Sequence, residues 1–153
     1  MPLTVLSGMP TGVSEEYQDM AFKCGNPQIY NMPTPASYAA AASTTYLSTD
    51  ILGFMILDAG NGASAHTATL PTAALLAAAI RGIFSSRGVI VGDSLFFVIA
   101  NTSSGAGAFT VAAGSGGTFD THAAQTIAQN TSREFMIRFT NGTPGSEAYS
   151  IYG

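Results

Sequence analysis

The two histidines are the side chains of this sequence best suited to acid–base chemistry or to metal binding. His66 and His122 lie in the segments Ser-Ala-His-Thr-Ala and Asp-Thr-His-Ala-Ala. A zinc site would need a third ligand, for which Asp58 and Asp120 are the candidates. The spacing of these residues matches no metal-binding motif. We therefore interpret both histidines as surface or strand-end residues and expect no bound metal.

The single cysteine, Cys24, excludes an intramolecular disulfide and a cysteine metal cluster. A nucleophilic cysteine would need a histidine close in space, and the surrounding segment Phe-Lys-Cys-Gly-Asn-Pro offers no support for such a pair. We interpret Cys24 as a small, buried or half-buried thiol without a catalytic role.

The carboxylates do not group as the paired acids of a glycosidase would. Asp58, Asp93 and Asp120 lie at predicted turns, where an aspartate side chain accepts hydrogen bonds from backbone N–H groups. Glu134 and Arg138 share one face of a predicted strand. They could form a salt bridge within the sheet or between subunits, or form a solvated face of little energetic value. We expect neither enzymatic activity nor a cofactor.

The composition of the chain indicates a protein that packs against other proteins. Charged residues make up 9% of the chain and hydrophobic residues 46%, whereas an ordinary soluble domain is about one quarter charged. The net charge is −4, and the five cationic residues are scattered along the chain. Since no basic stripe is available to neutralise phosphates, we do not expect nucleic acid as a partner.

We expect neither a membrane span nor a secretion signal. The longest apolar stretches, 51–57 and 70–80, are shorter than the roughly 20 residues that cross a bilayer. The N-terminal segment has no cationic start and no apolar run of signal length.

Residues 1–48 differ from the rest of the chain, because repeated prolines interrupt every regular element there. The apolar residues of this segment show no clean period but are too numerous for a solvated tail. We predict an extended N-terminal arm that lies either in an apolar groove of a neighbouring subunit or over its own domain. The residues proposed to bind a partner through this arm are Phe22, Ile29, Tyr30, Met32, Pro33 and Pro35.

Residues 49–153 carry short apolar or alternating runs separated by turn signals such as Asn61-Gly62. This pattern predicts an all-β fold, an antiparallel β-sandwich or jelly-roll-like domain with one short helix over 73–80. We find no internal repeat. The predicted strands are 51–57, 66–70, 89–91, 95–100, 109–112, 125–129, 134–140 and 148–152.

The alternation of apolar residues identifies the candidate core of this domain. Phe135, Ile137 and Phe139 share one face of the predicted strand 134–140, opposite Met136 and its charged neighbours. The complete predicted core is Phe54, Ile56, Leu95, Phe97, Ile99, Phe135, Ile137 and Phe139.

The order of the segments 69–80, 91–102, 109–116, 127–135, 138–141 and 145–149 resembles a β-rich module of structural proteins in tailed bacteriophages, including cyanophages, and in some large DNA viruses. The resemblance covers about the last two thirds of the chain. It implies a surface element of a virion. The absence of heptads and the short length favour a capsid decoration (cement) protein over a fibre.

From this resemblance and the composition we expect a viral structural protein that binds and stabilises the outer capsid surface. Its expected partners are the major capsid protein and further copies of itself, as a homotrimer or, second, as a dimer. The expected location is the virion, with assembly in the host cytoplasm. The alternatives are a head-fibre, tail-fibre or spike tip that binds a host receptor or glycan through aromatics such as Phe119, Tyr149 or Tyr152, and a soluble host-interaction protein.

Overall fold

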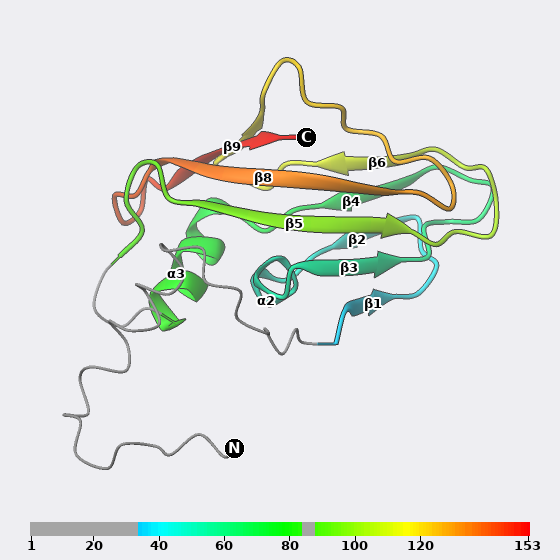
Figure 1. The fold of residues 1–153 in the computed structure, drawn as a ribbon, viewed down its shortest axis with the longest axis horizontal. Coiled ribbons are helices and arrows are strands. Elements are labelled where there is room, and N and C mark those ends of the chain that lie inside the picture. Colours follow the sequence, from blue (N-terminus) through cyan, green and yellow to red (C-terminus); the bar gives the residue numbers. More distant parts are fainter. Residues whose placement is uncertain (1–33, 84–87) are drawn as a thin grey trace, which may run out of the picture. The chain divides into compact units, whose positions relative to one another are not determined.

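The computed structural model describes residues 34–83 and 88–153, shown as coloured ribbon in Figure 1. They lie in a compact unit that begins at Met32. Of the predicted arm residues, Phe22, Ile29, Tyr30, Met32 and Pro33 lie outside the described residues, as does Cys24. Pro35 is half-buried, directly before the first strand.

Two β-sheets form the described part of the chain, which is mostly β as the sequence predicts. The six-stranded sheet has the strand order β1-β3-β5-β8-β9-β7, and the three-stranded sheet has the order β2-β4-β6. The six-stranded sheet consists of β1 Ala36–Tyr38, β3 Met55–Asp58, β5 Ser94–Asn101, β7 Gly117–Phe119, β8 Ser132–Asn141 and β9 Ala148–Tyr152. The three-stranded sheet consists of β2 Ser43–Thr45, β4 His66–Thr69 and β6 Phe109–Ala112.

The chain alternates between the two sheets from β1 to β6, and each of the strands β1 to β4 pairs in parallel with the strand two places later. Ile56 of β3 lies between Ala36 of β1 and Ile99 of β5, while Thr67 of β4 lies between Ser43 of β2 and Thr110 of β6. The first six strands therefore wind as a coil whose opposite sides are the two sheets. This regularity has no counterpart in a sequence repeat.

The prediction of purely antiparallel sheets is wrong, because the coil makes the three-stranded sheet entirely parallel and the six-stranded sheet mixed. Asn61 and Gly62 do form a turn, but it carries the chain from one sheet to the other instead of closing a hairpin. Only the pairs β5–β8 and β8–β9 are antiparallel. Turn chemistry is the same for a hairpin and for a crossover, so the sequence alone could not distinguish them.

Within the described residues, two helices lie between the strands, where the sequence predicted one. The helix α3, Ala73–Ile83, begins near the predicted position and continues through Gly82. The helix α2, Ser48–Leu52, replaces the first part of the predicted strand 51–57. The Asp50 carboxylate accepts a hydrogen bond of 2.7 Å from the backbone N–H of Leu47 and thereby stabilises the start of α2.

Two further predicted strands are not regular strands. Residues 89–91 lead into the turn before β5 without strand pairing, and residues 125–129 contribute a single bridge between Thr126 and Thr110. The predicted boundary at residue 48 also differs from the structure, since β1 and β2 belong to the sheets. Each is only three residues long and carries no alternating apolar pattern, so the strands become apparent only through pairing with the distant strands β3 and β4.

The two sheets share one hydrophobic core. Of the predicted core residues, Ile56, Phe97, Ile99, Phe135, Ile137 and Phe139 are completely buried, and Leu95 packs partly buried against them. Phe54 is the exception, with 39% of its surface exposed. It follows the end of α2 with a positive φ of 75°, a backbone conformation that places it outside the alternation of β3.

The loop between β5 and β6 packs closely on the turn between β3 and β4. A Cβ atom at Gly107 would lie 2.0 Å from the carbonyl oxygen of Ser64. This loop is therefore part of a tight crossover that requires glycine at position 107.

We predict that Phe135→Ala lowers the free energy of unfolding by about 3–5 kcal/mol, because it empties a fully buried ring position. The Phe135 ring stacks on Phe97 at 5.6 Å between centroids. Chemical denaturation measures the effect, and Thr140→Ala on the exposed face of the same strand is the control, expected to change stability by less than about 0.5 kcal/mol. A near-neutral Phe135→Ala would contradict the assignment of this face to the core.

Candidate functional site

The fold brings His66 together with Asp58, one of the two carboxylates considered from the sequence. The His66 Nε2 and Asp58 Oδ2 atoms lie 3.1 Å apart. Asp58 has no exposed surface and His66 has 2%. The end of β3 and the start of β4 place these two side chains, which face the interior between the sheets.

All polar atoms of this pair have partners inside the protein. His66 Nδ1 lies 2.7 Å from the carbonyl oxygen of Ala41, which can only accept, so Nδ1 carries a proton. The Asp58 carboxylate accepts hydrogen bonds from the Tyr46 hydroxyl and from the Gly60 N–H, each at 2.8 Å. A second proton must lie between His66 Nε2 and Asp58 Oδ2, because two lone pairs at this distance would repel each other.

Tyr46 completes the buried network as a hydrogen-bond donor. Burial, followed by the negative charge of Asp58 and the hydrogen bond to it, raises the pKa of the Tyr46 hydroxyl strongly. The hydroxyl therefore keeps its proton at any physiological pH. We name Tyr46, Asp58 and His66 the buried polar cluster.

The buried polar cluster is built to hold the coil together and has no open side for a substrate. Its members and their partner Ala41 come from the crossovers β1–β2 and β2–α2 and from the strands β3 and β4. The carbonyl oxygen of Asp58 also accepts a hydrogen bond of 2.8 Å from the N–H of Thr102, directly after β5. Because both His66 nitrogens have partners and both side chains are buried, this pair has no free position for a substrate proton or a metal ion.

His122 forms a second, unrelated contact with Asp120 on an exposed loop. Its Nδ1 atom lies 3.3 Å from Asp120 Oδ1, and the His122 side chain is 93% exposed. Such an exposed pair contributes at most about 1 kcal/mol. Within residues 34–83 and 88–153, no group of three His, Cys, Asp or Glu side chains is placed to hold a metal ion.

The three turn aspartates act as the sequence predicts. Asp58 accepts from Gly60 N, Asp93 from Ile90 N at 3.0 Å, and Asp120 from His122 N at 3.0 Å. The expectation that these carboxylates cap backbone N–H groups is confirmed. They therefore serve the turns and are not paired across a cleft.

Sequence reasoning missed one ion pair, between Arg81 at the end of α3 and Glu147 directly before β9. Arg81 Nη2 lies 3.1 Å from Glu147 Oε1, and the Glu147 side chain is 2% exposed. The backbone N–H of Glu147 itself and then Arg81 hold the pKa of this carboxyl below its usual value. The two residues lie far apart in the sequence, and no local pattern links them. The pair fastens the helix to the six-stranded sheet.

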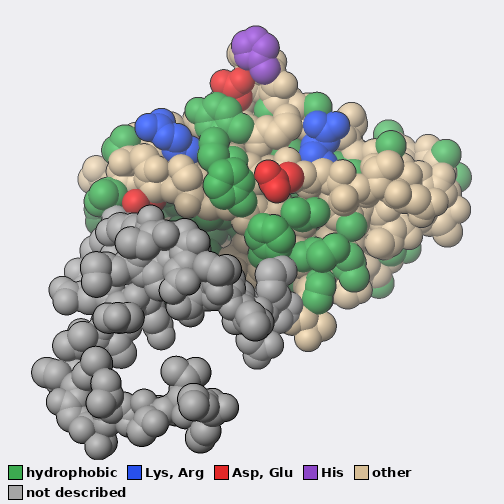
Figure 2. Space-filling model, in the orientation of Figure 1, with side chains coloured by type: hydrophobic (Ala, Val, Ile, Leu, Met, Phe, Trp, Pro, Cys, Tyr) green, Lys and Arg blue, Asp and Glu red, His purple; other side chains and the backbone are tan. Residues whose placement is uncertain are grey.

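The outward-facing side of the six-stranded sheet carries apolar side chains between polar and charged ones. On β5 and β8, even-numbered residues face outward and odd-numbered residues face the core, so Phe96 and Met136 lie outside. Phe96 is 52% exposed. Figure 2 shows hydrophobic patches on the face in view, with basic and acidic side chains between them. We call this surface the outer sheet face.

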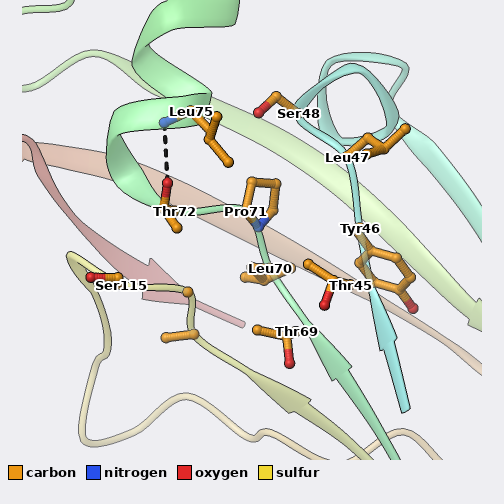
Figure 3. Close-up of a pocket in the computed structure, with 12 residues that line it drawn as sticks. Thr45, Tyr46, Leu47, Ser48, Thr69, Leu70, Pro71, Thr72, Leu75 and Ser115 are labelled. Atoms are coloured by element: carbon orange, nitrogen blue, oxygen red, sulfur yellow. Dashed lines mark hydrogen bonds between the residues drawn. The ribbon is translucent and has the colours of Figure 1, made fainter.

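A second apolar surface is a shallow cavity at the carboxyl ends of the three-stranded sheet (Figure 3). Its volume is about 350 Å³, and it is open to solvent between the starts of α2 and α3. Leu47 and Leu75, 63% and 61% exposed, stand at its rim with Pro71. Thr72 Oγ1 already accepts the hydrogen bond of Leu75 N at 3.2 Å, so the start of α3 is capped by its own chain.

Of the aromatic residues considered for receptor binding, Tyr149 is buried. It has 1% exposure, and its hydroxyl donates a hydrogen bond of 2.7 Å to the carbonyl oxygen of Pro71. Burial raises its pKa to about 12. Phe119 packs partly buried against the core, and Tyr152 is half-buried on the outer sheet face.

Comparison with known proteins finds no matching family model, and no curated protein or solved structure matches this chain significantly. Among the described residues, no helix is long and apolar enough to span a membrane. Function is therefore inferred from the surface and the buried groups of the chain itself.

We predict that Asp58→Ala costs about 3–5 kcal/mol of unfolding free energy, because it leaves buried hydrogen-bond donors without an acceptor. Tyr46, Gly60 and His66 would lose their shared partner. Thermal and chemical unfolding measure the loss. His122→Ala, in the exposed pair, is the matched control and should stay within about 1 kcal/mol of the parent. Equal effects of the two substitutions would contradict the structural role of the buried polar cluster.

Proposed function

We propose that this chain is a viral structural protein, a capsid decoration (cement) protein that binds the outer surface of the capsid shell. In this role it stabilises the shell through contacts between subunits. Its partners are the major capsid protein and further copies of itself, and its location is the surface of the virion after assembly in the host cytoplasm.

The observation that carries this proposal is the exposure of large apolar side chains on two surfaces that share no residue. Phe96 marks the outer sheet face, and Leu47 and Leu75 mark the cavity at the ends of the three-stranded sheet. Exposed apolar surfaces of this kind indicate contacts with other proteins. Two such surfaces suit a protein that touches both a shell and a neighbouring copy.

The chemistry of the polar groups supports the same proposal. The histidine and carboxylate that could act together are sealed in the core and satisfied by each other. A cement protein needs no reactive group, since its stabilisation comes from buried contact area multiplied over many copies.

Within the mostly-β fold we propose a sandwich, in which the two sheets cover one core. This is compatible with the resemblance of the last two thirds of the chain to a phage and large-virus structural module. The parallel coil of β1–β6 differs from the antiparallel jelly roll expected there.

The fibre or spike tip remains the rival from another class. It requires aromatic side chains presented at loop ends for a receptor or glycan. The burial of Tyr149 removes one of its three candidate residues, so the structure favours the decoration role over this alternative.

The test is the copy number of this protein in purified particles, measured by quantitative mass spectrometry against the main shell subunit. We expect a ratio close to that of the shell subunit. A few copies per particle would replace the decoration role with a fibre or spike, and absence from the particle would overturn both.

A second test addresses the arm. Deleting residues 1–31, which precede the compact unit, should leave the unfolding temperature unchanged and weaken binding to purified shells. Cosedimentation with shells measures the binding. Unchanged binding by the folded, shortened protein would contradict a partner-binding arm.

A further inference from the structure

The outer sheet face is organised in rows that cross the six-stranded sheet. Phe96 of β5 pairs with Met136 of β8, and Met136 pairs with Tyr152 of β9. All three side chains point to the same side, away from the core. They form a continuous apolar row, which we call the central row.

Two opposite charges flank the central row on β8. Glu134 lies one outward position before Met136, and Arg138 lies one outward position after it. Both side chains are exposed, and no ion pair joins either of them to another described residue. The row beside Glu134 continues with Val98 on β5, and the row beside Arg138 continues with Ser94.

This arrangement is complementary to itself under a two-fold rotation. When a second copy is laid face to face with its β8 antiparallel to the first, each central row lies on the other. Glu134 of each copy then faces Arg138 of the other. A two-fold contact uses the same patch on both partners, so every favourable contact occurs twice.

We propose that two copies of this chain associate through the outer sheet face, with the two-fold axis running along the central row. The apolar side chains of Phe96, Met136 and Tyr152 supply the buried area at the centre. The two Glu134–Arg138 pairs select the antiparallel orientation, because a parallel arrangement would place like charges against each other. This contact forms between two copies in the absence of the capsid shell. It corresponds to the dimer, which is the second of the two self-assembly forms expected from the sequence.

The first experiment measures the mass of the full-length protein by sedimentation over a range of concentrations. We expect a dimer of twice the 15.7 kDa of one chain. Glu134→Arg and Arg138→Glu should each raise the dissociation constant about tenfold or more, because each breaks both symmetry-related pairs. The double variant restores complementary charges and should recover most of the parent affinity.

Arg133→Glu is the matched control. It reverses a charge next to Glu134, but its position on β8 belongs to the opposite side of the strand, with Phe135 and Ile137. It should leave the dissociation constant unchanged. If Arg133→Glu weakens the dimer as much as the variants of Glu134 and Arg138 do, any change of charge weakens association, and the proposed contact is overturned.

A second experiment locates the axis. In a background with Cys24→Ser, a short thiol-specific cross-linker, a bismaleimide with a span of about 10 Å, should join Met136→Cys between copies, because the axis passes beside position 136 in both copies and sheets packed face to face lie about 10 Å apart. Ser132→Cys lies on the same face but away from the axis, opposite Thr140 of the other copy, and should not cross-link.

Three results would overturn the inference. The first is a parent protein that is still monomeric at about 100 µM, because the dissociation constant of the dimer would then lie above about 100 µM. The second is a double charge variant as weak as the single variants, and the third is cross-linking at position 132 instead of 136. Each of these experiments is done without capsid shells. A negative result would therefore overturn the dimer without deciding the copy-number test of the decoration role.

Discussion

The arrangement of this chain depends on one buried carboxylate, that of Asp58. A charged group without solvent is costly unless hydrogen bonds replace the water, and Asp58 receives them from Tyr46, Gly60 and His66. These donors come from successive crossings of the chain between the two sheets. Because the Asp58 carboxylate needs all of these donors, it holds the segments that connect the two sheets in register. The parallel winding of β1–β6 depends on it.

Because the chain winds between two sheets, its apolar residues have only the core between these sheets as an interior. The strands β3 to β6 each bury one side in a core shared by the two sheets, while the other side is less buried. On the six-stranded sheet that outward side also carries Phe96, Met136 and Tyr152. Part of the hydrophobic composition thus lies at the surface, where it stabilises contacts with other molecules instead of the fold.

The same architecture separates reactive groups from solvent. His66 and Asp58 have the chemistry of an acid–base pair, but each side-chain polar atom of the pair has a hydrogen-bond partner inside the protein. The charged residues left outside, Glu134 and Arg138, stand on either side of an apolar row. Their value lies in orienting a partner, because exposed charges contribute more to specificity than to affinity.

Local sequence patterns were enough to predict the mostly-β class, the positions of β5, β6, β8 and β9, and the turn roles of Asp58, Asp93 and Asp120, since alternation and turn chemistry are local properties. The three-dimensional structure was needed to show that β1 and β2 are strands, that residues 48–52 are helical, and that neighbouring strands of the coil run parallel. It also decided which of two possible carboxylates meets His66. These features arise from pairing between residues far apart in the chain, and a local pattern carries no information on which distant segments meet.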